Sequence, residues 1–258
     1  MKRSFPLILA LALLATGRPL QAASETDAAA ARALVKRYAD AIVGIELVVT
    51  MRLKFGDREQ APREQRIEVN GTVISAAGLT VTSLAAVDPQ SQFDAMRSSQ
   101  GGGGRGPELV GTDFKEVKLR FADGKEVPAR FVLKDADLDL AFMAPETAES
   151  GRQYPYVDLA QSTEGVVMNS YFFVSRAPKT LQRVPTIRRT EVIGIVEKPR
   201  RFYLVTDPTP ALPVLDPEGR VLGISLQYFA NGRLTGIVVL PSGDIAEIAK
   251  QAVVSGPK

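Results

Sequence analysis

Hydrophobic and polar positions follow two different periods near the N-terminal end of the chain. Over residues 28–42 the apolar side chains recur at helical spacing, at Leu34, Val35, Tyr38, Ala41 and Ile42. Over residues 45–53 every second residue is apolar. The first pattern predicts an amphipathic helix with Thr26 or Asp27 as its N-cap, and the second predicts a strand with one buried face.

Most of the remaining chain consists of short apolar runs separated by turn residues. Alternating runs at 117–121 and 127–133 flank the pair Asp123-Gly124, which favours a hairpin because glycine adopts a positive φ without steric cost. Further apolar runs lie at residues 138–143, 166–174, 192–196, 202–205, 221–226 and 234–240. Many short strands at such spacing predict an all-β protein, either a barrel or a sandwich.

Two segments depart from this strand pattern. Near the C-terminal end, Ser242 can cap a helix, on which one face carries Ile245, Ile248, Ala249 and Ala252. Residues 88–116 are rich in Gly, Ser and Gln, so we expect a long flexible Gly-rich surface loop there.

The first residues have the features of a secretory signal peptide. Lys2 and Arg3 precede an apolar run at 5–15, and small residues follow at Ala22 and Ala23. A transmembrane anchor is the alternative, but the apolar run is short for a bilayer. We therefore expect residues 1–22 to be removed and the mature protein to be periplasmic or secreted, without a membrane span.

Cleavage of this leader changes the charge of the protein. The whole chain has 32 basic and 29 acidic residues, and the leader carries Lys2, Arg3 and Arg18 but no acid. The mature chain is therefore formally neutral. Neutrality gives no support for a nucleic-acid partner.

The absence of two residue types limits the available chemistry. The sequence has no histidine and no cysteine. This composition excludes a Ser-His-Asp triad, a Cys-His pair, an imidazole metal site, a thiolate site and a disulfide. We expect no metal and no cofactor.

Several segments resemble, in order, the trypsin-like serine proteases of the HtrA/Deg group. The resemblance spans about residues 45–252 and is carried by 71–82, 117–126, 135–141, 215–224 and the pair Pro241-Ser242. It implies a chymotrypsin fold of two six-stranded antiparallel β-barrels with an N-terminal and a C-terminal helix. The implied parts are a helix at 23–44, a first barrel at 45–146, and a second barrel with the last helix at 147–258.

The same resemblance implies a degenerate active site. The family histidine falls at Ala85, the triad aspartate is kept at Asp139, and the nucleophile falls at Pro210. Acyl transfer needs an activated hydroxyl, a base and N–H donors for the oxyanion. Ala85 accepts no proton and Pro210 has neither a hydroxyl nor an N–H; moving the nucleophile to Thr209 still supplies no base. We expect no catalytic residues and interpret the chain as a pseudoprotease.

Other motifs give weaker indications. Asp135, Asp137, Asp139 and Glu146 match the ligand spacing of a calcium loop, but Leu140 stands where that loop needs glycine. Residues 101–106 match a dinucleotide fingerprint outside the required strand–helix context. A Ser-Lys dyad would need a buried lysine, and Ser175 and Lys179 lie in a charged stretch.

A basic run distinguishes the second half of the chain. It comprises Arg176, Lys179, Arg183, Arg188, Arg189, Lys198, Arg200 and Arg201. The run is either a patch for an acidic protein or anionic envelope component, or a solvated face balanced by nearby acidic residues.

Binding is the leading functional hypothesis, because the cleft of this fold can accept an extended peptide by strand pairing without a nucleophile. The candidate peptide cleft comprises Thr209, Ala211, Leu212, Ser225 and Leu226. We therefore expect a peptide-binding adaptor, regulator or chaperone-like factor. Two alternatives are an active serine-type hydrolase with an unconventional site and a structural subunit of an envelope assembly.

Overall fold

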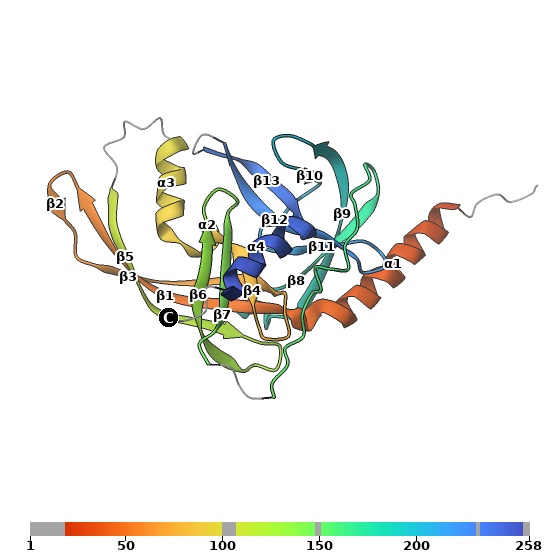
Figure 1. Cartoon of the computed structure of the whole chain (residues 1–258), viewed down its shortest axis with the longest axis horizontal. Coiled ribbons are helices and arrows are strands. Elements are labelled where there is room, and N and C mark those ends of the chain that lie inside the picture. Colours follow the sequence, from red (N-terminus) through yellow and green to blue (C-terminus); the bar gives the residue numbers. More distant parts are fainter. Residues whose placement is uncertain (1–18, 100–106, 148–150, 231–232, 255–258) are drawn as a thin grey trace, which may run out of the picture.

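The computed structural model describes residues 19–99, 107–147, 151–230 and 233–254, and within them the chain forms two β-barrels (Figure 1). Strands of the first barrel are β1 (Ile42–Phe55), β2 (Arg58–Glu59), β3 (Arg63–Val73), β4 (Thr80–Ser83), β5 (Glu108–Arg120), β6 (Glu126–Asp135) and β7 (Leu140–Pro145). The sheet order is β2-β1-β3-β4-β7-β6-β5, and antiparallel pairing of β1 with β5 closes a ring of six strands.

The second barrel is closed in the order β10-β13-β12-β11-β8-β9. Its strands are β8 (Ser170–Arg176), β9 (Pro185–Val196), β10 (Phe202–Val205), β11 (Pro213–Leu215), β12 (Val221–Ala230) and β13 (Arg233–Pro241). The expected fold class, two six-stranded antiparallel barrels with terminal helices, is confirmed.

Each barrel encloses its own core, and a third core joins them. In β1 the alternating residues Ile45, Leu47 and Val49 are buried inside the first barrel, as the period of two predicts. The joining core contains residues of both barrels and both terminal helices, including Leu34, Phe142, Leu215, Ile224 and Ile245. The joining core is therefore shared by the two barrels and both terminal helices.

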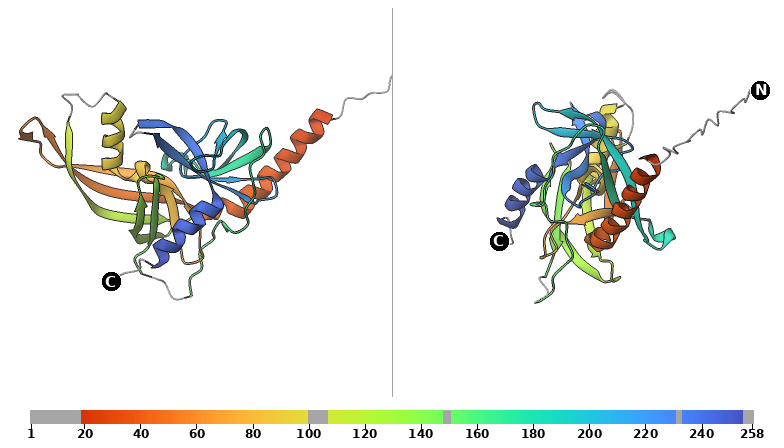
Figure 2. Two further views of the ribbon diagram at one scale, coloured as in Figure 1. Left: turned by 45° about the horizontal axis from the view of Figure 1, so that its top comes forward. Right: turned by 90° about the vertical axis from the view of Figure 1, so that its right-hand side faces the viewer.

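The terminal helices lie on opposite sides of the molecule (Figure 2). Helix α4 (Ser242–Val254) buries the predicted face, with Ile245, Ile248 and Ala252 in the joining core. Helix α1 (Pro19–Tyr38) is followed by the 3-10 turn η1 (Ala39–Ala41) and is anchored by the hydrogen bond from Tyr38 Oη to Gly219 O, 2.6 Å long.

Helix α1 begins before the predicted N-cap at Thr26 or Asp27, because the residues at 20–23, Leu-Gln-Ala-Ala, all have high helix propensity. Residues 1–18 of the predicted leader lie outside the described residues, and the predicted cleavage point falls within α1. None of the described helices combines the length and the apolar character needed to cross a membrane.

The prediction of an irregular loop at 88–116 is wrong at both ends. The described residues form α2 (Leu84–Val87), α3 (Pro89–Ser99) and, from Glu108 on, strand β5. The polar start of β5 becomes a strand because it pairs with β1 as far as Lys54↔Glu108, a partner far away in sequence. The glycine-rich residues 100–106 lie outside the described part of the chain.

Candidate functional site

The aspartate at the triad-equivalent position is a buried carboxylate at the junction of the barrels. Asp139 lies in the turn between β6 and β7 with a φ of +57° and is 2% exposed. Its Oδ2 accepts hydrogen bonds from Ser83 Oγ at 2.6 Å and from the Gln227 N–H at 2.8 Å, and its Oδ1 accepts one from the Ala85 N–H at 2.7 Å. Burial raises the pKa of Asp139, and these three donors oppose that rise.

These contacts join three elements. Ser83 ends β4, Ala85 belongs to α2 and Gln227 belongs to β12 of the second barrel. The Leu84 N–H also donates to the main-chain oxygen of Asp139 at 2.9 Å. Asp139 thus fastens the start of α2 to its own turn and ties the first barrel to β12.

The structure brings Ala85 next to Asp139, where the family resemblance puts a histidine. The Ala85 methyl is buried, and its carbonyl oxygen accepts a hydrogen bond from Gln92 Nε2 of α3 at 2.7 Å. Among the contacts of Asp139, hydroxyl and main-chain N–H groups take the place of an imidazole. Within the described residues, the hydrogen-bond partners of the Asp139 carboxylate are thus one hydroxyl and two main-chain N–H groups.

Pro210 lies in the loop between β10 and β11, and this loop is closed onto β12. The Ala211 N–H donates to Ser225 O at 2.7 Å, and the Leu212 N–H donates to Ser225 Oγ at 3.3 Å. Ser225 Oγ in turn donates to Thr209 O. Because Pro210 has no N–H and the next two N–H groups are occupied, none of these three residues offers a donor to an oxyanion.

The five predicted cleft residues do lie together, but mostly in the interior. Ala211, Leu212, Ser225 and Leu226 are 3%, 2%, 0% and 1% exposed. Thr209 is half-buried, and its Oγ1 accepts a hydrogen bond from Arg188 Nη2. Thr209 is therefore the one side chain of this set that a ligand can reach without displacing core residues.

An uncovered strand edge follows this buried set. Strand β11 pairs with β12 only through Val221, Gly223 and Ile224. Beyond Ser225, no strand of the described chain lies on that side of β12, whose other side pairs with β13. The residues along this edge, Gln227 to Ala230, are half-buried.

Sequence reasoning missed Gln227 and Ser83 as partners of Asp139, since nothing in a sequence pattern shows which donors reach that carboxylate.

The predicted basic patch is largely neutralised within the chain. Arg176 pairs with Asp40, Arg183 with Glu46 and Glu68, Arg189 with Asp27 and Glu191, Arg200 with Asp244, and Arg201 with Glu197 and Glu164. Arg188 lies over the ring of Phe173. Lys179 and Lys198 form no ion pair within the described residues. The eight residues are thus spread over several local pairs.

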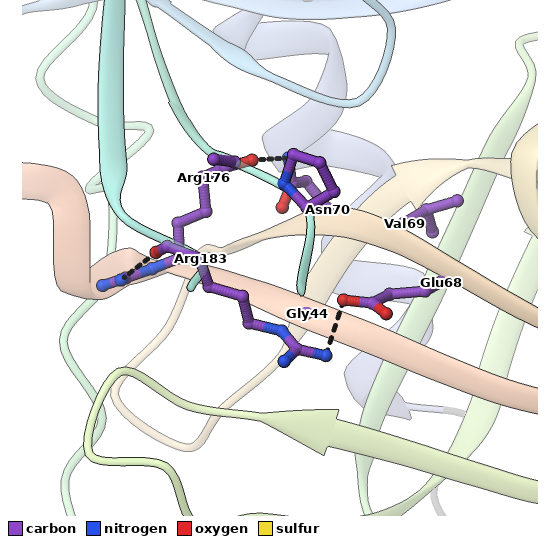
Figure 3. A pocket seen from close by; sticks show the side chains of 8 residues that line it. Gly44, Glu68, Val69, Asn70, Arg176 and Arg183 are labelled. Atoms are coloured by element: carbon purple, nitrogen blue, oxygen red, sulfur yellow. Dashed lines mark hydrogen bonds and ion pairs between the residues drawn. The ribbon is translucent and has the colours of Figure 1, made fainter. Parts of the chain in front are cut away.

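Arg176 and Arg183 border a cavity of about 210 Å³ between the β8–β9 hairpin and β3 (Figure 3). Arg183 Nη2 lies 2.7 Å from Glu46 and 2.5 Å from Glu68, and Arg176 Nε donates to Ile42 O at 2.8 Å. The hydrogen bond from Arg120, with the charges of Arg120 and Arg183, lowers the pKa of Glu46. These contacts lock the two barrels together at the cavity.

The described residues contain no group of three potential metal-binding side chains. Asp135 instead accepts a hydrogen bond from the Leu138 N–H at 3.0 Å, and Leu140 is fully buried in β7. The segment that matches the ligand spacing of a calcium loop is therefore a turn that leads into the core strand β7.

The fold and this junction define a trypsin-like peptidase domain. The family model described as "Trypsin-like peptidase domain" matches residues 69–224, more than half of the chain, and the chain belongs to this family. Among solved structures it is similar to the protease domain of MamO from Magnetospirillum magneticum in its apo form, with a TM-score of 0.50 and 15% identity over 82% of this chain and 97% of that one. At this identity the likeness concerns the fold alone. A comparison with curated proteins finds no match.

Proposed function

We propose that the protein is an exported, catalytically inactive trypsin-like protease homologue that binds extended polypeptide segments. In this role it serves as an adaptor, a regulator or a chaperone-like factor. The observation that carries the proposal is the set of partners around Asp139. A hydroxyl and two main-chain N–H groups fill the carboxylate's surroundings, in a chain without histidine.

The Pro210 loop supports the loss of catalysis independently. The main-chain donors of Ala211 and Leu212 are bonded to Ser225, so restoring a hydroxyl at position 210 would not create an oxyanion site. A hydrolase using unconventional residues would need another nucleophile with a base beside it. The buried hydroxyl of Ser83 does contact Asp139, but both side chains are shielded from solvent.

The free edge of β12 favours a peptide ligand. Main-chain groups of an unpaired strand edge are complementary to another extended backbone, and side chains flanking the edge set specificity. The Gln227 N–H on this edge already donates to Asp139, so a peptide would pair from Tyr228 toward Ala230. Thr209, half-buried at the neighbouring loop, would lie beside the bound backbone.

A partner of this kind agrees better with the structure than an acidic envelope component does. Five of the eight basic side chains already pair with carboxylates of the same chain, which reduces their attraction for an external anion.

Peptide binding is tested with a fluorescent library of unstructured decapeptides and mass spectrometry of the recovered peptides. Phe229→Pro, which removes an N–H from the β12 edge, should weaken binding at least roughly tenfold. Arg58→Pro, in the exposed two-residue strand β2, is the matched control and should bind like the parent. Equal binding by the parent and Phe229→Pro, or recovery of cleaved peptides, would overturn the proposal.

Export and removal of the leader are tested separately, by N-terminal sequencing. The protein purified from the envelope fraction should begin near Ala23 in N-terminal sequencing, whereas an intact Met1 on the envelope protein would refute cleavage of the leader.

A further inference from the structure

One long uncovered strand edge of the described chain belongs to β3. Strand β3 pairs with β1 from Arg63 to Thr72, but on its other side β4 reaches only Thr72 and Val73. Residues 63–69 therefore have no strand neighbour on that side within the described residues. This part of β3 lies where β1, β3 and β5 extend beyond the rest of the first barrel (Figure 1). An open edge of this length is complementary to another extended backbone.

Three charged side chains along this edge, the exposed Arg63 among them, form no ion pair or hydrogen bond with the described residues. The other two, Glu64 and Arg66, are also exposed. They stand opposite Thr50 and Val48 of β1, and so they share the outer face of the sheet. The neighbouring Gln65 stands opposite buried Val49, which puts it on the other face.

This charge pattern is self-complementary in one antiparallel register. If β3 pairs with β3 of a second molecule about a two-fold axis at Gln65, Glu64 of each chain lies opposite Arg66 of the other. In the same register Arg63 lies opposite Ile67, and its aliphatic stem can cover that half-buried side chain. Cross-strand pairs of opposite charge stabilise a sheet, whereas like charges placed directly opposite destabilise it.

We propose that a second copy of this chain pairs with the Arg63–Ile67 edge of β3, forming a symmetric dimer through one continuous sheet. Glu64 and Arg66 of each edge then form two interchain ion pairs. Charges on a free edge can also serve to prevent pairing. Here, however, their order along the strand allows pairing with an identical edge. A dimer held by a single strand edge buries little area, so we expect a concentration-dependent equilibrium between monomer and dimer.

Sedimentation equilibrium over a wide range of protein concentrations tests the proposal, with charge reversals as variants. In Glu64→Arg, arginine faces arginine twice, and in Arg66→Glu, glutamate faces glutamate twice. Each variant should dimerise roughly 10- to 100-fold more weakly than the parent. Both positions are exposed, and circular dichroism checks that each variant is folded.

Mixing the two variants distinguishes this register from a general effect of charge. In the mixed dimer every arginine at 64 or 66 faces a glutamate, so the mixture should associate about as tightly as the parent. The double variant Glu64→Arg/Arg66→Glu should also recover dimerisation. A parent that stays monomeric, single variants that dimerise normally, or a mixture that fails to associate would each overturn the proposal.

Discussion

Asp139 is a buried carboxylate held by donors from three different elements. A buried carboxylate is expensive to desolvate, and three donors from β4, α2 and β12 offset that cost. Its role is therefore to hold the junction between the barrels. Two predictions belong to this residue.

Asp139→Ala should lower the free energy of unfolding by about 2–4 kcal/mol, because Ser83 Oγ and two N–H groups lose their acceptor in a buried site. Urea denaturation measures the change. The exposed Asp137 is the matched control, and Asp137→Ala should shift stability by less than about 0.5 kcal/mol. Equal effects of the two substitutions would contradict a structural role for Asp139.

The pKa of Asp139 predicts a pH dependence of stability. Burial raises this pKa above its ordinary value of 3.8, so the native state binds a proton more readily than the unfolded state. The contribution of Asp139 to stability should therefore decrease as pH rises from about 3.8 through the raised pKa. Asp139→Asn removes this titration, and its stability relative to the parent should improve over the same interval. A difference between the two proteins that stays constant with pH would contradict the prediction.

Two contacts between strands stabilise the fold, and a substitution in each can test its contribution. One is the ion network of Glu46 in β1, Arg120 in β5 and Arg183 at the end of the β8–β9 hairpin. The other is the close approach of β12 to β13, where glycine is required.

Glu46→Gln should destabilise the protein by about 1 kcal/mol at neutral pH, since it removes the charge that Arg120 and Arg183 share. The pKa of Glu46 is lowered from 4.5 by the hydrogen bond from Arg120, so its stabilising effect is present above pH 4.5. That effect is lost as pH falls through the lowered pKa. Thermal melts of the variant and the parent should therefore converge in acid. Glu59→Gln, at an exposed position without an ion pair among the described residues, should match the parent throughout.

Gly223→Ala should destabilise the second barrel by more than about 3 kcal/mol, because a Cβ there would lie 1.9 Å from the carbonyl oxygen of Leu240 in β13. Gly236, on the same hairpin, has open space around the Cβ position, so Gly236→Ala should change stability by less than about 1 kcal/mol. Chemical denaturation of both variants makes the comparison. Similar midpoints would mean that β12 and β13 are packed less closely than described.

Across the whole molecule, the two barrels share a core that also includes both terminal helices. Leu34 of α1, Phe142 of β7 and Ile245 of α4 belong to that one cluster. We therefore expect a single unfolding transition, with calorimetric and van't Hoff enthalpies equal. Two separate transitions in differential scanning calorimetry would contradict the shared core.

Local pattern predicts much of this architecture. Alternation over 45–53 identifies the buried face of β1, and the spacing of Ile245, Ile248 and Ala252 identifies that of α4. The order of family-like segments locates Ala85 beside Asp139, as the hydrogen bond between them shows. These features depend on residues close together in the sequence or on the order of motifs, and one sequence alone shows both.

Features set by distant contacts were not predictable. Helix α3 has a polar sequence, and the first half of β5 is a strand because β1 lies beside it. Burial of Ala211 and Leu212 follows from their bonds to Ser225 on another strand. The five residues predicted for the cleft lie together, but the sequence did not show that the loop of Ala211 and Leu212 is closed onto β12.

The proposed lack of catalysis in this trypsin-like fold is tested by intact mass spectrometry after treatment with a fluorophosphonate. Such a probe reacts with a hydroxyl activated as a nucleophile. We predict an unmodified mass for the folded protein and for Pro210→Ser, because neither has a histidine to activate a hydroxyl, and Ser225 occupies the N–H donors near position 210. A stoichiometric adduct on any serine or threonine of the folded parent protein would contradict the account.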